Sequence, residues 1–203
     1  MGVTQFSIKG DLADITKSFV KGTSTHTFGT SGMIIGRDVT TLNVTPSRKF
    51  VGQLGNILLE HDNVDERYFV PDSQLKVWRY LKGAKKELRT HVGSGAQYHY
   101  VEGSMAFPDL PENPSRTILT GEGGPSASRF KHIVRTDDGR YRRLTPIELE
   151  RLNGFPDDWT RYTAQGEVTD TKRAFFMGNA LVVDIVAMIG RQLAREFTAY
   201  KRR

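Results

Sequence analysis

The sequence predicts an α+β protein in which a β-rich region, residues 1–144, precedes a helical region, residues 145–203. Glycine, serine and threonine alternating with short β-branched stretches, and an Asp-Gly turn between two apolar stretches, favour the first region. Helical spacing of the apolar residues after position 180 favours the second. With 203 residues, 37% of them hydrophobic, the chain is long enough to bury a core.

The β-rich region contains one predicted helix. Residues 1–47 are rich in glycine, threonine and serine, and their short apolar stretches predict hairpins or irregular segments. A capping residue at position 72 or 73 begins a helix over residues 74–81, and Gly83 ends it. Trp78 falls on the same side as Leu75, so we interpret it as a packing residue.

Two glycine-rich loops are expected between strands. Residues 91–100 (HVGSGAQYHY) predict a loop that runs into a strand. Residues 115–120 predict another strand, which opens onto a loop over residues 121–128. A hairpin over residues 130–144, with Asp138 and Gly139 at its turn, closes the region.

The helical region begins with a capping box. Thr145 can cap the helix, Pro146 suits its first position, and Glu148 can reach back to the cap amide. This helix is expected to run to about residue 153 and to stop at Gly154. A last helix is expected after residue 180, with an apolar side that consists of Leu181, Val182, Ile185, Val186, Ile189 and Leu193.

Charge and cysteine content narrow the classes of function. The formal net charge is +6, and residues 76–143 hold all of the excess, with thirteen Lys and Arg against seven Asp and Glu. Such a segment is typical of a polyanion-binding surface, although an ordinary solvated surface explains it equally well. The absence of cysteine excludes disulfides, cysteine zinc sites and a thiolate nucleophile. We predict no metal site, no signal peptide, no membrane span and a cytoplasmic location.

Two ordered patterns stand in the second half of the chain. The first is residues 143–146 (RLTP), followed by Glu148, Arg151 and residues 154–157 (GFPD). The second is residues 176–180 (FMGNA), ahead of the apolar helix. In this order and spacing they resemble the ninth and tenth motifs of bacterial DNA (cytosine-5)-methyltransferases.

The resemblance covers roughly residues 92–193 and implies a fold and partners. Residues 116–118 (RTI) and the glycine pair 123–124 are similar to the end of the family's target recognition domain. The chain would then hold that DNA-reading domain and the helices that complete a class I methyltransferase domain dependent on S-adenosyl-L-methionine (AdoMet). The family's AdoMet glycine turn, Pro-Cys loop and Glu-Asn-Val strand have no counterpart, and residues 93–95 (GSG) lack the third glycine and a following helix. A separate catalytic chain is therefore the implied partner, as for the smaller subunit of a split enzyme or a fragment of a longer one.

Candidate DNA-binding residues lie mainly in the two loops. By resemblance, Gln97 fills the space left by a flipped base, and a solvated loop glutamine is the alternative. Arg129 is the best candidate for a base or phosphate contact, against a plain surface charge. Thr117 matches a recognition-domain threonine, although β propensity also explains it. The full set expected on double-stranded DNA is Gln97, Thr117, Gly121, Gly123, Gly124, Ser126, Ser128, Arg129 and Lys131.

The resemblance also assigns the turn at residues 178–180. In the family this turn lines the AdoMet pocket, so Asn179 and Ala180 would line it here; helix capping by Asn179 is compatible with that role. Arg143 and Arg151 are expected to tie the recognition domain to the core rather than to touch DNA.

Two functions of different class follow. The first is a DNA-recognition subunit or fragment of a DNA cytosine-5 methyltransferase of the restriction-modification type, inactive until its catalytic chain joins it. The second is a free-standing DNA-binding or regulatory module derived from such an enzyme. The AdoMet-pocket turn favours the first, because a pure DNA reader needs no such turn. An RNA-binding domain is disfavoured, since no stacking-platform motif is present.

Overall fold

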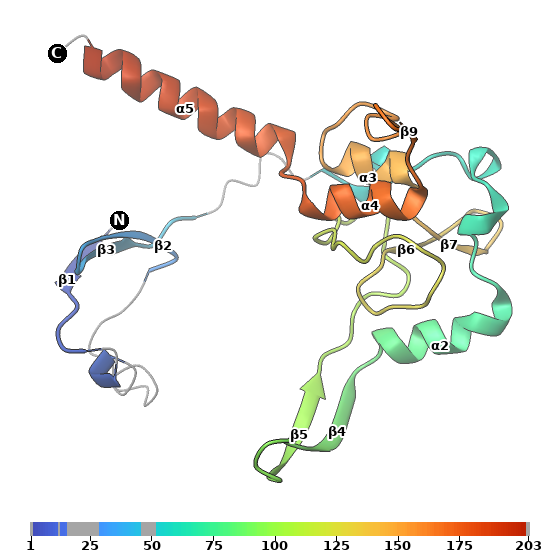
Figure 1. Cartoon of the computed structure of the whole chain (residues 1–203), viewed down its shortest axis with the longest axis horizontal. Helices are drawn as coiled ribbons and strands as arrows, with labels where there is room; N and C mark the ends of the chain where they lie inside the picture. The colour runs from blue at the N-terminus through green and yellow to red at the C-terminus, as the bar shows by residue number, and fades with distance from the viewer. Residues whose placement is uncertain (1, 12, 16–28, 46–51, 202–203) are drawn as a thin grey trace. The chain divides into compact units, whose positions relative to one another are not determined.

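A computed structural model describes residues 2–11, 13–15, 29–45 and 52–201 of the chain. It combines helices with small antiparallel sheets, which agrees with the predicted α+β class (Figure 1). The chain divides into two compact units, Met1–Phe50 and Val51–Arg203, and each is described by itself.

The first unit contains a three-stranded antiparallel sheet in the order β1-β3-β2. Its strands are β1 Val3–Ser7, β2 Ser31–Ile35 and β3 Asp38–Leu42. β2 and β3 form one of the expected hairpins, and Gly36 at its turn has a φ of 61°, which glycine adopts at little cost. The rest of that expectation falls partly on residues 16–28 and 46–47, which lie outside the described residues. All of β2 is exposed, so the sheet leaves apolar side chains facing solvent.

The second unit contains the other elements, most of them short. Its 3-10 helices are η1 Leu54–Ile57, η2 His61–Asn63 and η3 Glu66–Tyr68. Its described strands form antiparallel pairs: β4 Lys85–Thr90 with β5 Gln97–Glu102, β6 Ile133–Arg135 with β7 Tyr141–Arg143, and β8 Tyr162–Thr163 with β9 Gly166–Glu167. Its α-helices are α2 Asp72–Lys82, α3 Pro146–Leu152, α4 Asp170–Asn179 and α5 Val183–Lys201.

Helix α2 forms where the sequence predicts it, and Gly83 follows its last residue. The helix begins directly after Pro71, which takes the cap position expected for residue 72 or 73 and makes no side-chain capping bond. Trp78 is fully buried in a cluster with Val70 and Ile133. The interpretation of Trp78 as a packing residue is confirmed.

β4 and β5 form a two-stranded ribbon that extends away from α3 and α4 (Figure 1). Pairing runs from Lys85 opposite Glu102 to Thr90 opposite Gln97. The loop and strand predicted over residues 91–100 are confirmed. The sequence does not predict β4, because its residues (KKELRT) are mostly charged; the open ribbon lets those side chains face water.

The β6–β7 hairpin and α3 also match the prediction. Gly139 has a φ of 91° at the hairpin turn. The Glu148 N–H donates to Thr145 Oγ1 at 3.3 Å, and the Thr145 N–H donates to Glu148 Oε2 at 2.7 Å, which completes the capping box. Gly154, with a φ of 78°, follows the C-cap residue Asn153.

Two predicted elements differ from the structure. Residues 115–120 form no strand, because no strand of the described sheets pairs with them. Gly178 and Asn179 end α4 instead of beginning the last helix, which starts at Val183. The sequence does not predict α4, since one of its buried positions is an arginine, Arg173, which hides the apolar spacing.

The main core crosses the boundary expected near residue 144. It consists of Leu54, Ile118, Val134, Leu144, Leu149, Ala174 and Met177. Gly178 packs so closely on the segment before the glycine-rich loop that a Cβ there would lie 2.4 Å from the Thr120 nitrogen. Residues before and after position 144 therefore share one core within the second unit.

Helix α5 exposes its apolar side. Leu181, Val182, Ile185, Val186, Ile189 and Leu193 are between 39% and 73% exposed. Contrary to the expectation of no membrane span, the stretch Asp170–Thr198 is long and apolar enough to cross a membrane by length and composition, which alone is weak support. Residues 180–182 interrupt its helix, and Asp184, Arg191 and Arg195 lie within it. The described residues of α5 are exposed on all sides, and an exposed apolar side of this kind marks an interaction surface.

Candidate nucleic-acid interface

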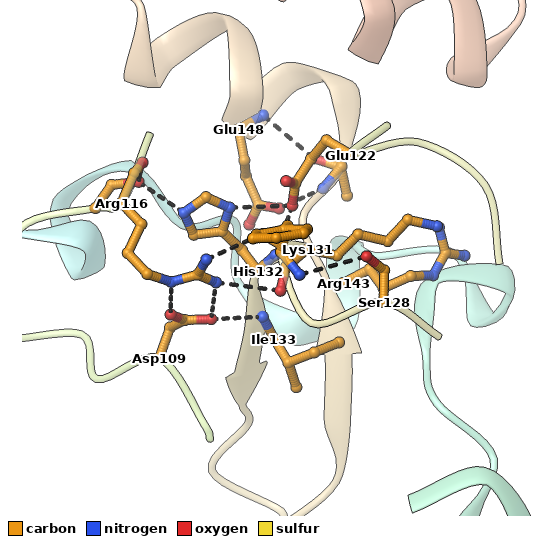
Figure 2. Close-up of polar contacts among 12 residues, drawn as sticks. Asp109, Arg116, Glu122, Ser128, Lys131, His132, Ile133, Arg143 and Glu148 are labelled. Atoms are coloured by element: carbon orange, nitrogen blue, oxygen red, sulfur yellow. Dashed lines mark hydrogen bonds and ion pairs between the residues drawn. The ribbon is translucent and has the colours of Figure 1, made fainter. Parts of the chain in front are cut away.

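Residues 121–129, here called the recognition loop, are anchored through a buried acid near the start of the loop, Glu122 (Figure 2). Glu122 Oε1 accepts a hydrogen bond from the His132 backbone N–H at 2.6 Å and lies 3.0 Å from the ring nitrogen Nδ1. The other ring nitrogen, Nε2, lies 3.0 Å from Ser115 Oγ. His132 and Glu122 are both buried, so these contacts fix the start of the loop to the body of the unit.

Two cationic side chains hold carbonyl groups of the recognition loop. Lys131 Nζ donates to the carbonyl oxygens of Gly124 at 2.9 Å and Ser126 at 2.8 Å. Arg143 donates to the Gly124 carbonyl at 3.0 Å and to that of Arg67 at 2.5 Å. Burial lowers the pKa of Lys131, and the charge of Arg143 lowers it further. The ammonium of Lys131, predicted to contact DNA, is therefore turned into the loop.

A network of ion pairs and hydrogen bonds surrounds Asp109 (Figure 2). Arg116 donates to both carboxylate oxygens of Asp109, at 2.8 and 3.1 Å, and the Ile133 N–H donates at 2.8 Å. Lys82 Nζ lies 3.6 Å from Asp109 and donates to the Lys131 carbonyl at 2.6 Å. Burial by itself would raise the pKa of Asp109, but these donors and cations together hold it below its ordinary value. The network fixes the backbone from which the Lys131 side chain extends.

Arg129 joins the recognition loop to the ribbon. Its guanidinium pairs with the Glu102 carboxylate and donates to the Gly103 carbonyl at 2.8 Å. Its side chain is only 13% exposed. A base or phosphate contact by Arg129 therefore requires this pair to open. Ser128 Oγ accepts from the Phe130 N–H at 3.3 Å, which tightens the end of the loop.

The remaining loop residues differ in accessibility. Gly121 and Ser126 are exposed, whereas Gly123 packs against α4 so closely that a Cβ there would lie 2.8 Å from the Thr171 Cα. Gly124 has a φ of 82°, a conformation that other residues rarely adopt. Glycine at these two positions is therefore explained by packing and backbone conformation.

Gln97 lies at the far end of the ribbon from the recognition loop. It is exposed and is the first residue of β5, whereas Glu102, the partner of Arg129, is the last. At about 3.3 Å per residue, roughly 16 Å of strand separates the two. The structure therefore does not bring the two predicted loops together.

The turn at residues 178–180 borders a hollow of about 330 Å³. Ala180 and the exposed Thr117 are among its lining residues, and so is Asn153. Asn179 is exposed, and its Nδ2 donates to the Phe175 carbonyl at 2.9 Å, within the last turn of α4. The hollow is lined by hydroxyl, amide and apolar groups and by Arg116, without a carboxylate.

A buried ion pair connects β7 to α3. The guanidinium of Arg142 donates to both oxygens of Glu148, at 2.7 and 2.9 Å. The Leu59 N–H donates to Glu148 at 2.9 Å, and the Leu59 carbonyl accepts from Arg142 at 3.2 Å. Arg151, expected to tie parts of the protein together, pairs with Asp157 and donates to the Ile57 carbonyl at 3.2 Å.

Sequence reasoning missed the residues that hold the site. Glu122, His132 and Asp109 stand apart in the sequence and form no recognisable spacing. The one signal in the sequence was Glu122, an acid within a glycine-rich loop of the basic segment, which indicates a structural role for its carboxylate. Their roles depend on contacts between distant segments, which no local pattern specifies.

The family model for C-5 cytosine-specific DNA methylase matches residues 25–195. The chain is also similar to the type II methyltransferase M.Sau3AI of Staphylococcus aureus, with 37% identity over 193 residues. That match takes in 95% of this chain and 43% of the relative, so the chain spans less than half the length of that relative. No solved structure gives a significant match. Because the family model covers most of its residues, this chain belongs to the C-5 cytosine-specific DNA methylases.

Proposed function

We propose that this chain is the DNA-recognition subunit or fragment of a cytosine-5 methyltransferase. In this role it binds duplex DNA, supports extrusion of the target cytosine and completes an AdoMet pocket together with a separate catalytic chain. One observation carries the proposal: a chain of this family without any cysteine aligns along 95% of its length with 43% of a methyltransferase.

The chemistry explains why cysteine matters. Carbon 5 of cytosine is a poor nucleophile until a thiolate adds to carbon 6, and this chain has no thiolate to offer. Bound AdoMet supplies the methyl group that carbon 5 then accepts. The contribution left to this chain is to bind the duplex and to offset the few kcal/mol that flipping a base costs.

The DNA-binding face combines the recognition loop with the ribbon. Both lie within the basic segment of residues 76–143. Backbone amides and hydroxyls suit phosphate contacts, and amide side chains suit base edges. The residues proposed to contact DNA are Gln97, Gly121, Gly123, Gly124, Ser126 and Ser128, with Arg129 once its pair with Glu102 opens. Thr117 lies outside this face, at the hollow beside residues 178–180.

The apolar side of α5 is proposed as the contact with the catalytic chain. More than half of the relative's length has no counterpart in this chain. The exposed apolar residues of α5 would be removed from water by packing on such a part. A polypeptide carrying the Pro-Cys and Glu-Asn-Val motifs, encoded beside this chain, is the expected occupant. A free-standing DNA-binding module would have no such neighbour.

Co-expression followed by size exclusion tests the partnership. The two polypeptides are expected to elute together, and Ile189→Asp should separate them by placing a carboxylate in the apolar face. Thr198→Asp is the matched control. Thr198 lies nine residues, or about two and a half turns, after Ile189, and therefore on the opposite side of the helix. Two separate monomers in the unsubstituted pair, or equal effects of both substitutions, would contradict the proposal. Partition of the lone chain into lipid vesicles would instead favour a membrane role for α5.

A further inference from the structure

Lys131 is a buried cation without an acid. It is 6% exposed, and none of the described carboxylates lies within ion-pair distance of its ammonium. Buried lysines are normally paired with an acid, because removing a charge from water is costly. Here the ammonium donates to two carbonyl groups, and Arg143 converges on one of them, that of Gly124.

These contacts determine which way the loop peptides face. In a trans peptide the carbonyl and the N–H point in opposite directions, and the only described cis bond is Phe107-Pro108. Since the Ser126 carbonyl points at Lys131, the N–H of Ala127 points away from it. The amides of residues 126–129 have no acceptor in the described part of the chain. The loop therefore turns the unpaired N–H of Ala127 away from the Lys131 ammonium.

The Lys131 backbone and the recognition loop are both anchored to neighbouring segments. The Lys131 carbonyl accepts from Lys82 at 2.6 Å and from Arg116 at 3.1 Å, and both cations contact Asp109. On the other side, Gly123 packs directly against α4. The ammonium is thus held at a fixed place, and the loop is fixed around it.

We propose that Lys131 is a positioning residue for DNA binding: its ammonium, with Arg143, holds the Gly124 and Ser126 carbonyls inward so that the Ala127 amide faces a DNA phosphate. This rests on the proposed function and replaces the direct contact predicted for Lys131. Inward carbonyls next to buried positive charge leave an outward backbone donor in a positive electrostatic field, which is the chemistry that binds phosphate.

The test uses the full chain with Lys131→Met, which removes the ammonium and keeps the length of the side chain. On binding of a short mixed-sequence duplex, the Ala127 amide should gain protection from hydrogen exchange in the unsubstituted chain and lose most of that gain in Lys131→Met, because its N–H then no longer keeps one direction. Affinity for a short mixed-sequence duplex should fall about tenfold, with the same dependence on salt. Lys76→Met, an exposed lysine of α2 in the same basic segment, is the matched control for charge.

The outcomes separate this inference from the proposed function. The same gain of protection at Ala127 on duplex binding in Lys131→Met, or a salt dependence flattened by about one unit of slope, would overturn it, since the latter is the mark of a direct phosphate contact. Failure of the unsubstituted chain, alone and with its catalytic partner, to bind any duplex would contradict the proposed function instead. If exchange at β6, β7 and α3 shows that Lys131→Met does not fold, Lys131→Gln, which keeps a donor without the charge, decides the question by the same readouts.

Discussion

Buried carboxylates organise the polar interior of the second unit. Glu148 accepts a hydrogen bond from Leu59, 89 residues away, Asp109 from Ile133, 24 residues away, and Glu122 from His132, 10 residues away. Each is nearly inaccessible to solvent. A charge in this position is tolerated only while its partners remain, so single substitutions here should be far more costly than at the surface.

The pair of Arg142 and Glu148 gives the clearest stability test. Glu148→Gln leaves a buried guanidinium without its acid and is expected to lower the free energy of unfolding by about 3–5 kcal/mol. The matched control is Glu66→Gln, which breaks an exposed pair with Arg140 and should cost far less, because water screens that pair. Urea unfolding measures both. Similar losses for the two variants would contradict the assignment of Glu148 as a structural anchor.

Asp109 should make part of the stability depend on acid. Its folded pKa lies below the ordinary value, so the folded protein binds fewer protons than the unfolded chain at acid pH. The stabilisation is complete above the unfolded value of about 4 and is lost as pH falls through the lower folded value. Asp109→Asn should therefore flatten the fall in the free energy of unfolding below about pH 4. Denaturant unfolding at several pH values measures this, and an unchanged slope would count against the network; Asp137→Asn, at an exposed position, is the control.

At the scale of elements, local chemistry predicted the helices and turns that carry their own signals. Thr145 with Glu148 fixed the start of α3, and Gly139 fixed the β6–β7 turn, because capping and positive φ depend on few neighbouring residues. β4 was missed because an exposed strand can consist mostly of charged residues, which gives no strand-like pattern. α4 was missed because it buries Arg173, which interrupts the apolar spacing of a helix. The segment 115–120 has strand-like composition, yet no partner strand reaches it.

Gln97 is exposed at the end of the ribbon, so its proposed role in base flipping can be tested by substitution. If Gln97 occupies the space left by the target cytosine, Gln97→Ala in the enzyme joined with its catalytic chain should preserve DNA affinity and reduce extrusion of the base. A duplex with 2-aminopurine at the target position reports extrusion as a rise in fluorescence, and affinity is measured in parallel. Gln165→Ala, at another exposed glutamine, is the control. Were both signals unchanged in Gln97→Ala, it would be an ordinary solvated residue.

For the whole molecule, the sequence located the basic segment and the glycine-rich loop but not the means by which the loop is held. Lys131 carries a charge in a loop-flanking position, which favours an outward contact, yet the fold turns it inward. The core that spans the boundary expected near residue 144 could not be predicted for a similar reason. Leu54, Ile118 and Met177 meet in one core, and contacts across such sequence distances leave no periodic pattern.

Methyl transfer tests the central claim most directly. The pure chain, incubated with tritiated AdoMet and duplex DNA, should incorporate no label into cytosine above a control without protein, because it has no cysteine to activate the ring. Adding the separately purified catalytic chain should restore incorporation, and the catalytic chain by itself should remain inactive. Label transferred by this chain alone, or a catalytic chain whose activity is the same with and without it, would contradict the account.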